Sequence, residues 1–178
     1  SSEILAGSDA DDRIFGGDGN DTLRGGAGDD VLAGGGGNKD VADYSTDTSD
    51  LTVNLSTGVA SSDVSGEDTL SGIERVTAGS GDDTLIGDDS DNRLRGKAGD
   101  DILVGGGGDD RLFGGSGTDT VDYSSASSSV SIDLAQGTAS GEDVGSDRLK
   151  GIENVVGGSQ GDEIRGSSGD NELFGGAG

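Results

Sequence analysis

The sequence predicts an all-β fold in which short strands stack as a parallel β-solenoid. The first observation is a nonapeptide pattern, Gly-Gly-x-Gly-x-Asp-x-U-x with U a bulky aliphatic residue, which runs unbroken through residues 16–24 and 25–33. The second is an internal duplication, in which the segment that begins at Asp43 recurs from Asp122. The third is a composition of 38 Gly and 28% hydrophobic residues among 178, which leaves little bulky apolar material for an ordinary globular core.

Each nonapeptide predicts a tight turn followed by a short strand. Glycine at positions one, two and four lets the backbone turn with positive φ, and the Asp at position six closes the loop. Positions seven to nine have room only for a short strand, which excludes a helix almost everywhere. Two nonapeptides make one full turn with a strand on each side, so successive turns would stack about 4.8 Å apart.

The aliphatic residues at position eight predict the interior of the solenoid. Side chains at positions seven and nine point the opposite way along a strand, so the position-eight side chains share one side and form an aliphatic ladder. Its members are Ile14, Leu23, Leu32, Leu85, Leu94, Leu103, Leu112, Val121, Ile164 and Leu173.

The duplication divides the chain into three nonapeptide tracts and two irregular spacer segments. Asp43-Tyr44-Ser45 recurs as Asp122-Tyr123-Ser124, and Gly72-Ile73-Glu74 recurs as Gly151-Ile152-Glu153. The tracts cover residues 1–43, 78–122 and 157–178, and the spacers cover 44–77 and 123–156.

The spacers are expected to continue the solenoid with irregular turns. Strands are indicated by apolar residues at 51–55, 73–76, 130–134 and 152–156. We therefore interpret residues 1–178 as one module. The chain starts within a worn repeat, by which we mean one that keeps only part of the nonapeptide pattern, and it stops just before the next Asp. We therefore expect a fragment of a larger protein.

The charge indicates that cations are needed for folding. With 36 acidic and 11 basic residues, the formal net charge of −25 opposes any compact state. Without His or Cys, the usual ligands of zinc, copper and iron are absent, and the carboxylate and carbonyl oxygens suit Ca²⁺ better than Mg²⁺. About ten Ca²⁺ ions at the repeat loops would bring the charge to about −5.

Several functions are excluded at this point. The sequence has no nucleophile paired with a base, no His and no phosphate-loop lysine, so we expect that it is not an enzyme. No apolar run approaches the length of a membrane span, and we expect neither membrane insertion nor a nucleic-acid partner.

The repeated register is similar to that of RTX, or hemolysin-type calcium-binding, proteins, and the resemblance covers roughly two thirds of the chain. It implies a right-handed parallel β-roll, in which backbone carbonyls and the Asp carboxylates of two loops, separated by two nonapeptides, surround each Ca²⁺ ion. The position-six residues of the eleven loops are Asp12, Asp21, Asp30, Asp40, Asp83, Asn92, Asp101, Asp110, Asp119, Asp162 and Asn171. The loop glycines expected at the sites are Gly17, Gly19, Gly26, Gly28, Gly99, Gly106, Gly108, Gly115 and Gly117.

The family spacing implies particular pairs of ligands. They are Asp12 with Asp30, Asp83 with Asp101, Asn92 with Asp110, and Asp101 with Asp119. Asp21 pairs with Asp40 if one residue is inserted in the loop 34–40, and we expect Asn38 to adopt the left-handed conformation there.

Some loops depart from the pattern, and we expect lower affinity at them. Asn92 and Asn171 offer a neutral oxygen, and Ala10, Ser90 and Gln160 replace the position-four Gly. The position-five residues Asp11, Asp29, Asp82 and Asp109 are interpreted as a solvated surface.

The spacers contain two worn repeats with Asp68 and Asp147 at position six, where a Ca²⁺ ion is possible but less expected than in the tracts. Tyr44 and Tyr123, which open the spacers, are interpreted as packing over the end of the aliphatic ladder.

Alternate nonapeptides belong to opposite sheets, so the outer faces differ. Arg93, Arg95, Arg111 and Phe113 should share one face, whereas Thr84, Ile86, Ile102, Val104 and Thr120 should share the other. The first face suits an acidic polysaccharide, because Arg pairs with carboxylates and Phe offers an apolar platform. Cations that neutralise nearby acidic loops are the alternative. The second face suits a lateral contact, although strand preference for β-branched residues explains it equally well.

The resemblance favours a calcium-dependent structural module of a larger secreted or surface-bound bacterial protein, since RTX proteins are exported unfolded by type I secretion and fold in extracellular Ca²⁺. A polysaccharide-binding module, similar to the RTX modules of alginate epimerases, is the second hypothesis. An adhesin spacer is the third, because about ten stacked turns would span roughly 45 Å. All three place the chain outside the cell or on its surface.

Overall fold

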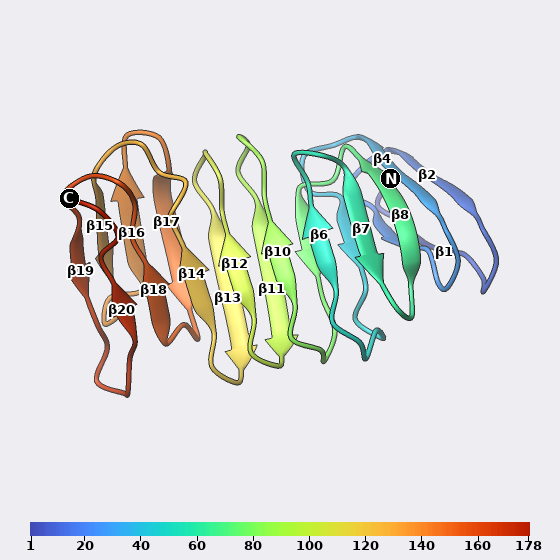
Figure 1. Cartoon of the computed structure of the whole chain (residues 1–178). Coiled ribbons are helices and arrows are strands. Elements are labelled where there is room, and N and C mark those ends of the chain that lie inside the picture. Colours follow the sequence, from blue (N-terminus) through green and yellow to red (C-terminus); the bar gives the residue numbers. More distant parts are fainter.

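The chain winds back and forth between two ten-stranded sheets, as the computed structural model of residues 1–178 shows (Figure 1). The first sheet contains, in spatial order, β1 (Ile4–Ala6), β3 (Thr22–Arg24), β5 (Val41–Asp43), β9 (Arg75–Thr77), β11 (Arg93–Ala98), β13 (Arg111–Ser116), β17 (Gly145–Lys150), β16 (Thr138–Gly141), β15 (Val130–Asp133) and β19 (Glu163–Arg165). The second contains β2 (Arg13–Asp18), β4 (Val31–Gly36), β8 (Gly66–Ser71), β7 (Val59–Ser62), β6 (Thr52–Asn54), β10 (Thr84–Ile86), β12 (Ile102–Val104), β14 (Thr120–Asp122), β18 (Asn154–Val156) and β20 (Leu173–Phe174).

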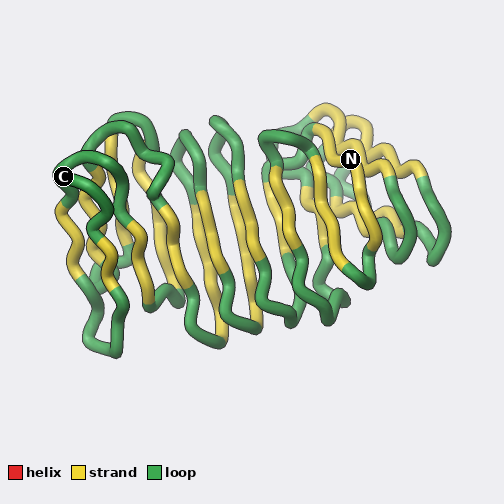
Figure 2. Tube along the Cα trace, viewed as in Figure 1, coloured by secondary structure: helices red, strands yellow, loops and turns green.

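The expected all-β roll is confirmed. Figure 2 shows strands and loops and no helix, and the two termini lie at opposite ends of the stack. No segment of the structure forms a helix that could span a membrane.

Strand pairing follows the repeat length. In the nonapeptide tracts the paired strands are parallel and offset by two nonapeptides, as in Thr84 with Ile102 and Arg93 with Arg111. Thr22 instead pairs with Val41, one position beyond two nonapeptides, so the insertion expected in the loop 34–40 is present.

The spacers depart from parallel stacking. In the first spacer β6, β7 and β8 run antiparallel to one another within the second sheet, and in the second spacer β15, β16 and β17 do the same within the first sheet. The strands expected at 51–55 and 130–134 are β6 and β15, but the added strands β7 and β16 were not expected. The antiparallel strands of the two spacers therefore lie in opposite sheets of the roll.

The aliphatic ladder forms the core between the sheets. Its members from Ile14 to Val121 are buried, with exposed fractions of at most 8%. The expectation is wrong for Leu173, which is 42% exposed, and Ile164 is only partly buried. Both residues lie on edge strands, β20 and β19, which have no further turn to cover them.

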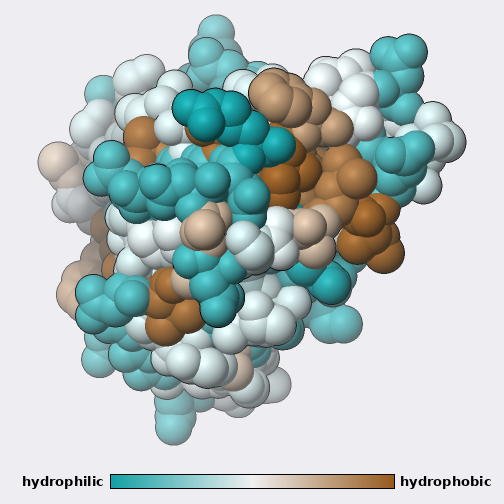
Figure 3. Space-filling model, turned by 90° about the vertical axis from the view of Figure 1, so that its right-hand side faces the viewer, coloured by the Kyte–Doolittle hydropathy of each residue, from teal (hydrophilic) through white to brown (hydrophobic).

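The ends of the solenoid expose some apolar surface. The end that carries β1 and β2 faces the viewer in Figure 3, where a few brown apolar patches stand among hydrophilic surface. Ile4 and Phe15 are among the exposed large hydrophobic residues, at 70% and 66%.

Glycine has two distinct roles in the loops. All nine glycines expected at positions two and four of the sites have positive φ, for example 84° at Gly17 and 103° at Gly28. The glycines at position one do not have positive φ, contrary to expectation. Their lack of a side chain instead leaves space for neighbouring oxygens.

Lys97 is the only non-glycine residue with positive φ, at 89°, and it replaces the position-two glycine of its loop. The left-handed conformation expected for Asn38 is therefore wrong. The inserted loop reaches its partner without it, with positive φ at Gly35.

Candidate metal sites

The position-six carboxylates form a ladder along both edges of the roll. In each expected pair, one side-chain oxygen accepts a hydrogen bond from the backbone N–H of the preceding turn. Asp12 donates to Oδ1 of Asp30 over 2.8 Å, and Asp21 donates to Oδ1 of Asp40 over 2.6 Å. The same bond joins the other expected pairs, Asp83 with Asp101, Asn92 with Asp110, and Asp101 with Asp119. The structure thus brings every expected pair together.

The second oxygen divides the loops into two groups. In six loops Oδ2 is buried and accepts no hydrogen bond, and these oxygens belong to Asp21, Asp30, Asp40, Asp101, Asp110 and Asp119. A buried charged oxygen without a partner costs free energy, since desolvation is not offset by any interaction. At Asp119 the Gly115 N–H approaches the carboxylate without completing a bond. Six equivalent oxygen atoms without a hydrogen-bond partner, the orphan oxygens, indicate that all six bind the same kind of ligand.

Each orphan oxygen borders a small space, here called a cradle, that a side chain at the position-one glycine would fill. A Cβ atom built on Gly16 would stand 2.5 Å from the carbonyl oxygen of Gly34 and 2.7 Å from Oδ2 of Asp21. Similar clashes with the position-six carboxylate arise at Gly25, Gly96, Gly105 and Gly114. At Gly16, Gly34 and Gly114 a carboxylate oxygen and a carbonyl oxygen converge on one space, and these are the donor atoms that hard cations such as Ca²⁺ prefer.

Carboxylates alone do not make these sites. No three acidic side chains gather closely enough to hold a metal ion. The remaining ligands must be backbone carbonyls, which the close approach of successive loops supplies.

The other five loops are closed by a backbone hydrogen bond to the position-six side chain. In them the N–H of the position-two residue donates to the side-chain oxygen at position six, as from Ser8 to Asp12 over 2.7 Å and from Asp88 to Asn92 over 2.7 Å. Gly79, Gly158 and Ser167 do the same for Asp83, Asp162 and Asn171. None of these five position-two residues has positive φ, so the φ of position two separates the two groups.

The loops predicted to be weak from their sequence departures all fall in this second group. Ala10, Ser90, Gln160, Asn92 and Asn171 belong to four of the five loops. The fifth ends at Asp83 and has Ala78 at position one, a departure that the sequence analysis missed.

Burial raises the pKa of several ladder carboxylates. Desolvation, followed by neighbouring carboxylates, raises the pKa of Asp101 and of Asp110 to about 7, although each accepts a backbone hydrogen bond that lowers it. The pKa values of Asp30 and Asp119 are raised for the same first reason. A divalent cation beside these oxygens would reverse the effect, because it favours the ionised form.

The worn repeats are closed by tyrosine. The Tyr44 hydroxyl donates to Oδ2 of Asp68, and the Tyr123 hydroxyl donates to Oδ2 of Asp147, each over 2.7 Å. Oδ1 of these carboxylates accepts the N–H of Asp30 and of Asp110, which continues the ladder. Both tyrosines are buried in the core, and their bonds to Asp were not foreseen.

The position-five carboxylates form a second ladder, outside the first. Asp11, Asp29, Asp82 and Asp109 are exposed, as expected. Each nevertheless accepts a backbone N–H from the following turn, as Asp82 does from Asp100 over 2.8 Å. These residues therefore stabilise loop stacking in addition to solvating the edge.

Basic residues gather on the outer face of the first sheet. Nine of the eleven lie on its strands, in a chain with a formal charge of −25. We call the central group the basic surface, and it consists of Arg75, Arg93, Arg95, Lys97, Arg111, Arg148 and Lys150 around Phe113. The guanidinium carbons of Arg93 and Arg95 lie 4.9 and 5.4 Å from the Phe113 ring centre.

The basic surface contains no ion pair. The two salt bridges of the structure, Arg24 with Asp43 and Arg165 with Asp133, lie elsewhere. Burial and the neighbouring guanidinium groups of the basic surface lower the pKa of Arg93. An open hollow of about 440 Å³ adjoins Arg93, Lys97 and Phe113.

Comparison with known proteins agrees with this geometry. The family model of the RTX calcium-binding nonapeptide repeat matches the chain in four copies, over residues 6–38, 68–101, 86–121 and 149–178. The matches together cover well over half of the chain. Comparison with curated proteins finds no match.

Proposed function

Because the chain belongs to the RTX calcium-binding nonapeptide repeat family, we propose that residues 1–178 are one calcium-dependent module that folds when it meets extracellular Ca²⁺. The single observation that carries this proposal is the set of six buried carboxylate oxygens without a partner. The cradles formed by successive loops complete these sites only when the turns are stacked, so ion binding contributes directly to folding.

We propose six Ca²⁺ sites rather than about ten. They are the loops that end at Asp21, Asp30, Asp40, Asp101, Asp110 and Asp119. Six ions would add twelve positive charges and bring the formal charge from −25 to −13. Asp68 and Asp147 are proposed to bind no ion, because both of their oxygens already accept hydrogen bonds.

The proposed location follows from the same coupling. Extracellular calcium modules bind with dissociation constants of about 10⁻⁴ to 10⁻³ M, so they are filled outside the cell and empty in the cytosol. A chain that folds only on binding stays unfolded until it leaves the cell, which suits a secreted or surface-bound bacterial protein of which this module is one part.

Circular dichroism during a Ca²⁺ titration of the chelator-treated chain tests this proposal. We expect a largely disordered spectrum in chelator and a cooperative gain of β-structure as Ca²⁺ is added. Mg²⁺ at the same concentrations is the control and should give little structure. A fully folded spectrum in excess chelator would refute the coupling of binding to folding.

A second function, binding of an acidic polysaccharide, is favoured by the unpaired basic surface. Its arginines repeat from strand to strand, since Arg75, Arg93, Arg111 and Arg148 occupy neighbouring positions on β9, β11, β13 and β17. Parallel strands stand about 4.8 Å apart, so this row could pair with a linear polymer that carries regularly spaced carboxylates.

Retardation in a gel that contains a polyuronate tests the second function in saturating Ca²⁺. The double variant Arg93→Glu/Arg111→Glu should migrate as it does in a neutral-glucan gel. Arg13→Glu, on the second sheet, is the matched control and should still be retarded. Equal retardation of all three proteins would exclude this surface as the binding site, and retention by nucleic acid instead would reassign its ligand.

A further inference from the structure

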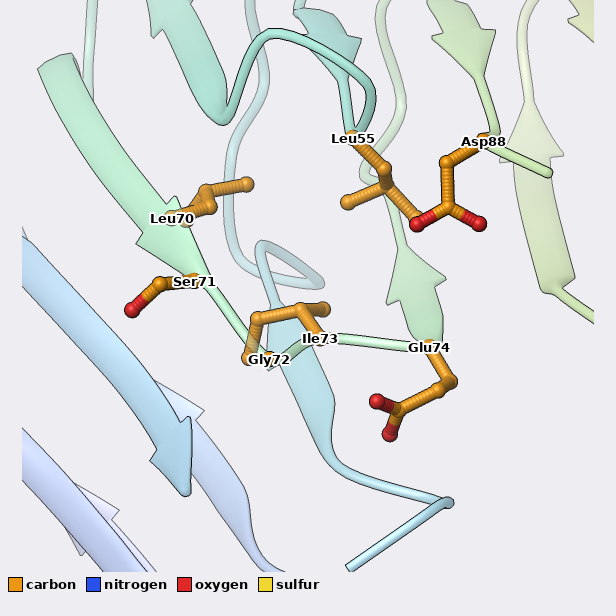
Figure 4. A pocket seen from close by; sticks show the side chains of 7 residues that line it. All are labelled: Leu55, Leu70, Ser71, Gly72, Ile73, Glu74 and Asp88. Carbon is orange, nitrogen blue, oxygen red and sulfur yellow. The ribbon is translucent and has the colours of Figure 1, made fainter. Parts of the chain in front are cut away.

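Two short turns of the spacers occupy loop positions in the roll without carrying the nonapeptide pattern. Gly72-Ile73-Glu74 joins β8 to β9, and Gly151-Ile152-Glu153 joins β17 to β18. The first turn crosses from the second sheet to the first and the second turn crosses back, so they lie on opposite edges. Figure 4 shows the first turn beside a small cavity of about 70 Å³, with the Glu74 carboxylate directed away from Leu55 and Asp88.

The glutamates of these turns take the place of a position-six Asp in the ladder. The backbone N–H of Asp40 donates to Oε2 of Glu74 over 3.0 Å. In the second unit, the N–H of Asp119 donates to Oε2 of Glu153 over 2.9 Å. Elsewhere this bond is accepted by Asp, as between Asp101 and Asp119 over 3.0 Å. The second oxygen of each glutamate accepts no hydrogen bond.

Each glutamate is bonded to the backbone of a residue whose own side chain carries one of the unpartnered oxygens. Asp40 and Asp119 are 0% exposed, and Oδ2 of each has no hydrogen-bond partner. A Cβ atom built on Gly34 would meet both the Gly72 carbonyl oxygen and Oδ2 of Asp40, and one built on Gly114 would meet the Gly151 carbonyl oxygen and Oδ2 of Asp119. These are the contacts that the Gly34 carbonyl and Asp21 make at Gly16.

We propose that Glu74 and Glu153 are Ca²⁺ ligands, which complete the sites of Asp40 and Asp119 where the repeat pattern offers no following Asp. The extra methylene of Glu compensates for a turn of three residues in place of a loop of six. The same arrangement on both edges of the roll argues for a built feature of the duplicated unit. This inference rests on the proposed calcium function and extends it to ligands outside the nonapeptide.

Counting bound ions in the full chain tests the proposal. Glu74→Gln and Glu153→Gln each keep an amide oxygen that can accept the backbone N–H, but each removes the charge. At a free Ca²⁺ concentration that just saturates the wild type, equilibrium dialysis should show one ion fewer for each variant and two fewer for the double variant. Glu67→Gln is the matched control, because the exposed Glu67 side chain makes no hydrogen bond, and it should bind the wild-type number.

The variants Glu74→Asp and Glu153→Asp keep the charge on a shorter side chain, so each should recover the lost ion at a lower Ca²⁺ concentration than the Gln variant needs. A Gln variant that fails to fold at saturating Ca²⁺ while the Asp variant folds also supports a ligand role, since Gln supplies the hydrogen-bond acceptor. Gln variants with the wild-type number of ions and a midpoint within twofold of wild type would overturn the proposal. A wild type that binds no Ca²⁺ would overturn the proposed function as well, so the wild-type isotherm distinguishes the two failures.

Discussion

Tyr44→Phe is the sharpest test of how the worn repeats are closed. The substitution keeps the ring in the core, where Tyr44 is 5% exposed, and removes only the hydroxyl that donates to Oδ2 of Asp68. A hydrogen bond to a charged group contributes about 1.5–3 kcal/mol, and the buried carboxylate loses its only partner at that oxygen. For a domain of this size, that loss corresponds to a decrease in Tm of roughly 3–12 °C.

The assay is thermal unfolding followed by circular dichroism at saturating Ca²⁺, together with a count of bound ions. Tyr123→Phe should lower the Tm by a similar amount, because its bond to Asp147 has the same length. The double variant should show the sum, since the two sites share no partners. The number of bound ions should stay at the wild-type value in all three. A Tm within about 1 °C of wild type, or a gain or loss of an ion, would refute the reasoning.

Four further predictions concern the core, the carboxylate ladder with and without Ca²⁺, and the strained loop. Leu103→Ala removes a fully buried ladder side chain and should lower the free energy of unfolding by about 2–5 kcal/mol in denaturant titrations, against a near-neutral Ile102→Thr on the exposed face of the same strand. The apparent Ca²⁺ affinity should fall as the pH decreases from 8 to 6, because protons compete for Asp101 and Asp110, whose pKa values are raised to about 7. In chelator, stability changes with pH in the opposite direction. Because the pKa values of these carboxylates are higher in the folded state than in the unfolded state, the metal-free fold gains stability as the pH falls through 7. Circular dichroism in chelator should therefore show more β-structure at pH 5 than at pH 8. Lys97→Gly relieves a positive φ that costs a non-glycine residue about 1 kcal/mol, so the Tm should rise by a few degrees. The same substitution removes a charge from the basic surface, so retention by polyuronate should weaken. An unchanged Tm would indicate that the hydrogen bond from Lys97 Nζ to the Ser45 carbonyl offsets the strain.

The regular part of the fold could be predicted from the sequence because its information is local and repeated. A glycine-rich turn and one aliphatic residue in each nonapeptide suffice to predict the strand, its buried face and the register of two nonapeptides per turn. The insertion before Asp40 was predictable for the same reason, since only one alignment preserves the position-six Asp.

The spacers were less predictable, because their structure depends on contacts between residues distant in the chain. The antiparallel strands β7 and β16 contain few apolar residues, and burial of Ala60 and Ala139 is decided by the neighbouring strands. The bonds from Tyr44 to Asp68 and from Tyr123 to Asp147 each span 24 residues. The one available signal was the duplication itself, which repeats both Asp-Tyr-Ser and Gly-Ile-Glu.

The division of the loops into two groups was only partly predictable. Replacement of the position-four glycine or of the position-six Asp identified four of the five closed loops. The loop that ends at Asp83 retains Gly79 at position two and Gly81 at position four, yet its Gly79 N–H donates to the carboxylate. Conversely, the loop with Lys97 at position two adopts the open conformation despite lacking the glycine. The residue type at positions two and four therefore does not by itself determine the conformation of the loop.

Anomalous X-ray diffraction from crystals grown in Ca²⁺ tests the central claim most directly. The account predicts anomalous peaks beside Oδ2 of Asp21, Asp30, Asp40, Asp101, Asp110 and Asp119, and no peak where a backbone N–H or a tyrosine hydroxyl already occupies the second carboxylate oxygen. Absence of peaks at the six orphan oxygens, or equal peaks in both groups of loops, would contradict it.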